Sequence, residues 1–149
     1  MIPIMLDAKR LKIGLAGRGD LAVRRLDWFR RQGVTPELFS DDPSDALVAA
    51  AGELIAPRLP DPGDLVALDV LWIADLDGHT AEDLVTLARA VKVLVNVEDR
   101  PALCDFHSVA EIRRGALLLT VSTGGASPGL AARIRSRLAM PLNAVSTSS

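Results

Sequence analysis

One stretch of this 149-residue chain stands out: Gly14-Leu15-Ala16-Gly17-Arg18-Gly19-Asp20-Leu21-Ala22. It follows an apolar, strand-like run and opens a helix-like run. Gly17, Gly19 and Ala22 have the G-x-G-x-x-A spacing of a dinucleotide-binding turn, in which small residues allow a tight turn, a close approach to pyrophosphate and close helix–strand packing. The pyrophosphate would lie on the unpaired N–H groups of the first helical turn, at the positive end of the helix dipole.

Strand-like and helix-like segments alternate outward from this turn. Apolar runs predict strands at 12–16, 37–40, 54–58, 69–74 and 92–96, and helical spacing or caps predict helices at 20–32, 42–51 and 80–90. We expect Asp42 to cap the second helix, with Pro43 at its first position, and Leu84, Leu87 and Ala88 to face inward from the third.

After Asn96 the pattern changes. Two more strands are expected at 106–109 and 116–122, with Arg113-Arg114-Gly115 in the turn between them, followed by a helix at 128–138. The sequence therefore predicts an α/β fold: a Rossmann-like doubly wound parallel sheet, then a short strand pair and a C-terminal helix. We place an NAD-binding domain at 1–104 and a dimerisation and substrate-site extension at 105–149.

Composition excludes several classes of function. The net charge of −2 and the scarcity of aromatic residues argue against a nucleic-acid partner. No apolar run is long enough to cross a bilayer and no signal-peptide pattern is present, so we expect a cytoplasmic protein without a membrane partner. Cys104 is expected to be a core residue, and His79 and His107 lack metal-ligand spacing, so no metal site is predicted.

Two acidic positions follow predicted strands. Asp41 and Asp42 lie about 20 residues beyond the glycine turn, where a carboxylate accepts ribose hydroxyls and repels a 2′-phosphate, which favours NAD over NADP. The alternative is that Asp42 only caps its helix. Glu98 and Asp99 follow the fifth strand at the edge where ligands gather, and are candidates for acid/base chemistry. The alternative for this pair is a polar turn before a proline.

A second glycine-rich turn lies near the C-terminal end. Gly124 and Gly125 open the last predicted helix and form a potential anion site. Arg133 and Arg137 lie on that helix, and with Arg113 and Arg114 they are suited to bind a polycarboxylate. A solvated basic helix face is the alternative.

Three segments resemble the precorrin-2 dehydrogenase/sirohydrochlorin ferrochelatase family, the N-terminal module of siroheme synthase. Residues 15–25 are similar to its V-G-G-G-x-V-A-x-R-K opening, and Asn96-Val97-Glu98-Asp99 followed by Phe106 is similar to its N-V-x-D…F segment. Residues 114–128 are similar to its R-G-x-L-x-x-A-I-S-T-G-G-x-S-P segment. The order and separations agree over nearly the whole chain.

The resemblance implies NAD-dependent oxidation of precorrin-2 to sirohydrochlorin, followed in some members by ferrous iron insertion, in a homodimer. It implies that Asp99 is the key acid/base residue. It implies cofactor contacts at Asp20, Leu21, Asp41 and Asp42, beside Gly17, Gly19 and Ala22 of the turn. Together with the arginine argument, it places the tetrapyrrole substrate at Asn96, Arg114, Ser122, Thr123, Gly124, Gly125 and Arg133.

Two other functions stay open. One is a non-catalytic NAD- or tetrapyrrole-binding Rossmann module. The other is an oxidoreductase of the same fold that acts on a different acidic substrate.

Overall fold

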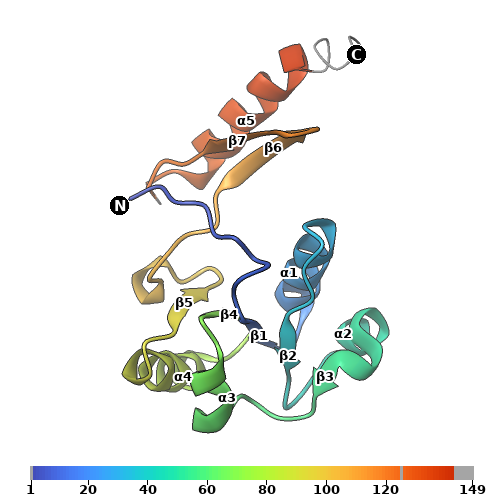
Figure 1. The fold of residues 1–149 in the computed structure, drawn as a ribbon, viewed down its shortest axis with the longest axis vertical. Coiled ribbons are helices and arrows are strands. Elements are labelled where there is room, and N and C mark those ends of the chain that lie inside the picture. The colour runs from blue at the N-terminus through green and yellow to red at the C-terminus, as the bar shows by residue number, and fades with distance from the viewer. Residues whose placement is uncertain (1, 125, 143–149) are drawn as a thin grey trace. The chain divides into compact units, whose positions relative to one another are not determined.

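The computed structural model describes residues 2–124 and 126–142, and the chain divides into two compact units (Figure 1). One unit spans residues 2–106, and the C-terminal unit begins at His107. Each unit has its own sheet.

The N-terminal unit is built on a five-stranded, fully parallel sheet with the order β3-β2-β1-β4-β5. The strands are β1 (Ile13–Gly17), β2 (Glu37–Phe39), β3 (Ile55–Ala56), β4 (Val70–Ala74) and β5 (Leu94–Val97). All residues of β1 and β4 are buried, as is typical of parallel strands covered on both faces. The predicted doubly wound sheet is thus confirmed.

Helices cover both faces of this sheet (Figure 1). Because successive side chains of a strand point to opposite faces, neighbouring residues of one strand belong to different cores. Leu15 and Trp72 pack in one core with α1 (Asp20–Arg31) and α2 (Asp45–Ala51). Their neighbours Ala16 and Ile73 pack in a second core with α3 (Pro62–Ala67) and α4 (Gly78–Ala90). Short 3-10 turns, η1 (Gly52–Leu54) and η2 (Pro101–Leu103), complete the connections.

Three helix predictions need correction. Ser44, not Asp42, caps α2: its Oγ accepts from the N–H of Leu47 at 3.2 Å, and the helix begins three residues later than predicted. The sequence reading missed α3, which Asp61 caps in a capping box with Asp64. On α4, Leu84 and Ala88 are buried as predicted, but Leu87 is 45% exposed.

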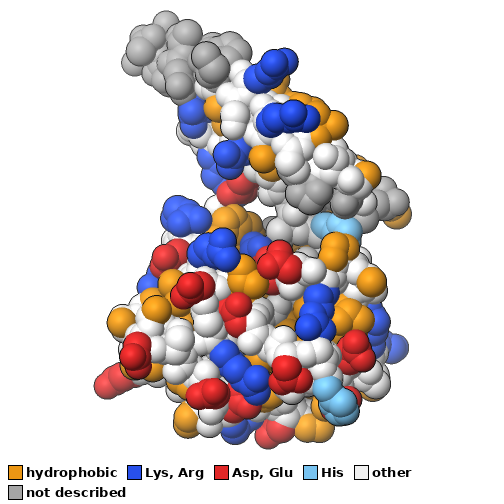
Figure 2. Space-filling view, turned by 180° about the vertical axis from the view of Figure 1, so that it is seen from behind, with side chains coloured by type: hydrophobic (Ala, Val, Ile, Leu, Met, Phe, Trp, Pro, Cys, Tyr) orange, Lys and Arg blue, Asp and Glu red, His pale blue; other side chains and the backbone are white. Residues whose placement is uncertain are grey.

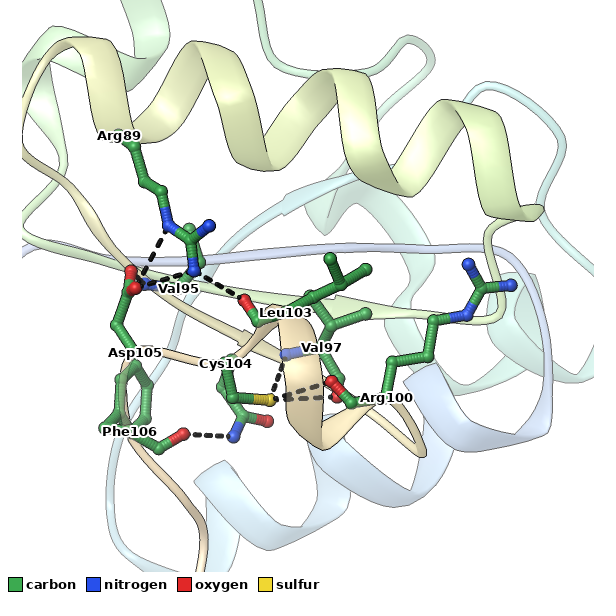
Figure 3. Close-up of polar contacts among 9 residues, drawn as sticks. Arg89, Val95, Val97, Arg100, Leu103, Cys104, Asp105 and Phe106 are labelled. Carbon is green, nitrogen blue, oxygen red and sulfur yellow. Dashed lines mark hydrogen bonds and ion pairs between the residues drawn. The ribbon is translucent and has the colours of Figure 1, made fainter. Parts of the chain in front are cut away.

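The segment after β5 does not form the strand predicted at 106–109. Instead it folds back along the open edge of β5 (Figure 3). The N–H of Asp105 donates to the Val95 carbonyl at 2.8 Å, and the Asp105 carboxylate accepts from the Val95 N–H at 3.0 Å. Sγ of Cys104 accepts from the Val97 N–H at 3.2 Å, and burial raises the pKa of this thiol. Phe106 then packs edge-on against Trp72, with ring centroids 4.8 Å apart.

The C-terminal unit contains an antiparallel ribbon and one helix. The ribbon pairs β6 (Ala110–Arg114) with β7 (Leu117–Val121), and α5 spans Pro128–Leu142. Arg113 and Arg114 therefore lie in a strand and not in the turn, where Gly115 instead adopts a φ of +56°. The helix is four residues longer than the predicted 128–138.

Candidate functional site

The glycine turn between β1 and α1 has the close packing that its spacing predicts. A Cβ on Gly17 would lie 2.7 Å from both the Cβ of Ala22 and the carbonyl oxygen of Ala74, so no larger residue fits without a shift. A Cβ on Gly19 would lie 3.1 Å from the carboxylate of Asp75. These contacts bring the first turn of α1 close to β1 and β4 at the carboxyl edge of the sheet.

The first turn of α1 offers four backbone N–H groups that a helix cannot satisfy internally. Asp75, the residue after β4, uses one carboxylate oxygen to accept from the N–H groups of Gly19 at 3.1 Å and Ala22 at 3.0 Å. Within the described residues, the N–H groups of Asp20 and Leu21 between them have no hydrogen-bond partner. An anion already lies on this turn, and two donors remain open, so the residues present fit a dinucleotide phosphate.

Arg18, between the two glycines, connects three parts of the carboxyl edge. Its Nε and Nη2 donate to the two carboxylate oxygens of Asp41 at 2.8 and 2.7 Å, and Nη1 lies 3.3 Å from Asp77. The hydrogen bond from the Arg18 guanidinium lowers the pKa of the Asp41 carboxyl, and the same bond to the Asp41 carboxylate raises the pKa of Arg18. Asp77 caps α4, because its carboxylate accepts from the N–H of Thr80. The hydrogen bonds from Thr80 lower the pKa of Asp77 more than the contact with Arg18 does.

The two acids after β2 therefore differ. Asp41, predicted to accept ribose hydroxyls, is already held by Arg18. Asp42 is exposed and neither caps α2 nor forms an ion pair within the described part of the chain. Both follow β2 at the carboxyl edge of the sheet, the edge at which Rossmann folds in general bind the ribose of a dinucleotide.

The two acids after β5 differ: the carboxylate of Glu98 is paired, and that of Asp99 has no partner in the described part of the chain. Glu98 accepts a hydrogen bond from Nε of Arg25 at 2.6 Å, and both side chains are largely buried. Asp99 is exposed, adopts a φ of +60°, and has no hydrogen-bond or ion-pair partner for its carboxylate in residues 2–124 and 126–142. Of the two predicted acid/base candidates, only Asp99 has an exposed carboxylate without a partner among the described residues.

Asn96, predicted to contact substrate, lies inside the fold at 5% exposure. Its Nδ2 donates to the carbonyl of Phe106 at 2.8 Å. This amide therefore holds the returning segment against β5 and is not presented to a ligand at the surface.

The other predicted substrate residues belong to the C-terminal unit. Ser122 and Thr123 shape the turn before α5: their hydroxyl oxygens accept from the N–H groups of Gly124 at 3.1 Å and Ser127 at 2.9 Å. Gly124 adopts a φ of +63°, and Gly125 lies outside the described residues. Arg114 lies in β6 and Arg133 on the exposed face of α5.

The two units differ in the sign of their net charge. From His107 onward the sequence contains five arginines and one glutamate, a formal charge of +4. Because the whole chain carries −2, residues 1–106 carry −6. Figure 2 shows blue arginine side chains over the C-terminal unit, and intermixed red and blue ones over the N-terminal unit. An acidic ligand is therefore attracted to the C-terminal unit.

Sequence reasoning missed the roles of Arg18, Asp75 and Arg25. The strand order could have indicated the first two, because Gly17 pairs in register with Ala74 and so brings Asp75 beside the glycine turn. Arg25 has no such signal, since only the packing of α1 sets it beside Glu98.

Among the described residues, no helix has the length and apolarity to cross a membrane, and no three His, Cys, Asp or Glu side chains gather where they could hold a metal ion. His79 instead lies 2.9 Å from Asp83 on the exposed face of α4.

Comparisons with known proteins agree with this geometry. The family described as "Putative NAD(P)-binding" matches residues 4–110, and the one described as "Sirohaem biosynthesis protein central" matches residues 114–139. The chain is 35% identical to a siroheme synthase of Methylococcus capsulatus and 32% identical to one of Nitrosococcus oceani, covering 92% of this chain and 30% of each relative. It thus spans about a third of these relatives. The solved structure of SirC, precorrin-2 dehydrogenase, has a TM-score of 0.74 at 24% identity, over 95% of this chain and 70% of that one.

The SirC likeness supports the fold, and the family matches confirm the resemblance drawn from the three sequence segments. With a glycine turn at the carboxyl edge of a doubly wound sheet, the chain belongs to the family described as "Putative NAD(P)-binding".

Proposed function

We propose that this chain is an NAD-dependent dehydrogenase that oxidises precorrin-2 to sirohydrochlorin. The observation that carries the proposal is the open carboxylate of Asp99 at the same sheet edge as the glycine turn. In this reaction the substrate loses a hydride and a proton. NAD, when bound, supplies the hydride acceptor.

The residues of the chain would hold the reactants and remove the proton. The open N–H groups of Asp20 and Leu21 would bind a phosphate of the dinucleotide. The carboxylate of Asp99 would take the proton from the macrocycle, while Arg25 keeps neighbouring Glu98 out of the chemistry.

The charge of the C-terminal unit supports the choice of substrate. Precorrin-2 has eight carboxylates, and the formal charge of +4 beyond residue 106 favours such a polyanion. We assign its binding to Arg114, Arg133 and the turn at Ser122, Thr123, Gly124 and Gly125. We also propose a homodimer formed through the segment 105–149, in the cytoplasm, where the free thiol of Cys104 fits a reducing compartment. Ferrous iron insertion ranks below dehydrogenation, since no observation here favours it.

An anaerobic assay tests the proposal. Protein, NAD and precorrin-2 are mixed, and the absorbance of NADH and of sirohydrochlorin is followed. Wild type should produce both in equal amounts, and Asp99→Asn should lower turnover by at least about a hundredfold at nearly unchanged NAD affinity. Asp27→Asn, on the exposed face of α1, is the matched control.

The alternatives give different results. Bound NAD without turnover would favour a binding module, and turnover of another acidic substrate would keep the dehydrogenase but change its substrate. Full activity in Asp99→Asn would remove this residue from the mechanism.

A further inference from the structure

The ion pair between Arg18 and Asp41 lies at the end of the second strand, the position that determines whether a Rossmann fold prefers NAD or NADP. A carboxylate at the end of the second strand accepts the ribose hydroxyls of NAD and repels the 2′-phosphate of NADP. Asp41 occupies this position, yet the Arg18 guanidinium is bound to both of its oxygens, at 2.8 and 2.7 Å. The charge that should exclude NADP is therefore neutralised by a neighbour.

Arg18 is held in this position from several sides. Its own carbonyl accepts from the N–H of Ser44 at 2.7 Å, which ties the glycine turn to the segment after β2. Its guanidinium also reaches Asp77, at the N-cap of α4, from the other side. The strand order explains this span, because β1 lies between β2 and β4. The side chain is still 26% exposed, so a ligand can reach it.

The chemistry of Arg18 suits a phosphate. A guanidinium binds phosphate oxygens through two parallel N–H donors, as it binds the Asp41 carboxylate here. A 2′-phosphate that enters this position can therefore replace one of the two acids that Arg18 now contacts. The hydroxyls of NAD can instead use the oxygens of Asp41.

We infer that Arg18 and Asp41 act as a pair that sets the choice between NAD and NADP, with Arg18 as the group that accommodates a 2′-phosphate. This inference rests on the proposed dinucleotide site. It assigns opposite effects to the two residues: Arg18 favours NADP, and Asp41 favours NAD.

The test is the ratio of the dissociation constants of NAD and NADP, measured by isothermal titration calorimetry on the full chain. Arg18→Ala should shift the ratio towards NAD by about tenfold or more, because the Asp41 charge is no longer neutralised. Asp41→Ala should shift it towards NADP by a similar factor, because Arg18 is released. Arg18→Gln and Asp41→Asn replace any alanine variant that fails to fold.

Arg89→Ala is the matched control, because Arg89 donates twice to Asp105, at 3.0 and 2.7 Å, near the start of β5 and away from the glycine turn (Figure 3). Its ratio should equal that of wild type. If the Arg18 and Asp41 variants bind NAD but do not shift the ratio in opposite directions, the inference is overturned. The proposed dinucleotide site is not affected by that result. If wild type binds neither dinucleotide, the proposed function itself is wrong.

Discussion

One oxygen of the Asp75 carboxylate accepts a hydrogen bond from the backbone N–H of Gly19 at 3.1 Å, on the turn where a dinucleotide phosphate is expected. A side-chain anion is thus held at the positive end of α1 by the residue that follows β4. A phosphate bound on this turn would be negative like the Asp75 carboxylate, so we expect Asp75 to lower the affinity of the proposed site for a dinucleotide.

Asp75→Asn should therefore bind NAD more tightly. Removing one charge at this solvent-exposed position corresponds to about 1 kcal/mol, or about fivefold in Kd. The same variant should lose about 0.3–1 kcal/mol of folding stability, because α1 loses a favourable N-terminal charge. Calorimetric titration and urea unfolding measure the two effects, with Asp27→Asn as control. NAD binding no tighter than in wild type would show that Asp75 does not compete with the phosphate.

The neighbouring acids Glu98 and Asp99 should differ in their effect on stability. Glu98→Gln should lower the free energy of unfolding by about 1–3 kcal/mol, because it weakens a charged hydrogen bond to the largely buried Arg25. Asp99→Asn should change it by less than about 0.5 kcal/mol, since Asp99 is exposed and asparagine tolerates its φ of +60°. Urea unfolding measures both. Equal losses would mean that Asp99 has a structural partner as well.

Gly17→Ala should destabilise the N-terminal unit by about 1–3 kcal/mol, because the new methyl group would lie 2.7 Å from the backbone oxygen of Ala74. Gly129→Ala is the control: a Cβ there meets no atom within 4 Å. Thermal or urea unfolding of the two variants gives the comparison. An unchanged midpoint for Gly17→Ala would indicate that β1 and β4 separate easily at this point.

Acid should weaken the contact between Arg58 and Asp64. The paired guanidinium lowers the pKa of Asp64 from 3.8 to about 2, so the folded state holds this carboxyl ionised more strongly than the unfolded state does. That stabilisation is complete above about pH 4 and is lost as the pH falls towards 2. The stability difference between wild type and Asp64→Asn should shrink over this interval when urea unfolding is repeated at each pH. Gly129→Ala, which changes no titratable group, is the control.

Local signals in the sequence were enough to predict most strands of the parallel sheet. β1 and β4 are buried throughout, so their apolar runs could be recognised without knowledge of the neighbours. The start of α2 was predicted wrongly because Asp42 and Ser44 are both good capping residues. The N–H of Ser44 donates to the Arg18 carbonyl, a contact with a distant segment that holds Ser44 at the cap position before Asp45.

Contacts between distant segments explain the other differences. Phe106 begins a strand-like sequence, but its ring packs on Trp72. The Asp105 carboxylate accepts the hydrogen bond of the Val95 N–H in β5, which a further strand would otherwise accept. Likewise, Arg18 and Asp41 are 23 residues apart, and Gly19 and Asp75 are 56 apart. Only the order of the strands brings these groups together. The sequence therefore predicted the glycine turn between β1 and α1, but not the ion pair and hydrogen bonds around it.

The side chains of Cys104 and Asp105 occupy N–H groups on the outer side of β5 that would otherwise be open to another strand. At the opposite side, β3 is only two residues long. Neither border of the five-stranded sheet therefore offers a template on which a foreign or misfolded chain could continue it. A further strand that adds to β5 would first have to displace the side chains of Cys104 and Asp105, so we expect this edge to resist edge-to-edge aggregation.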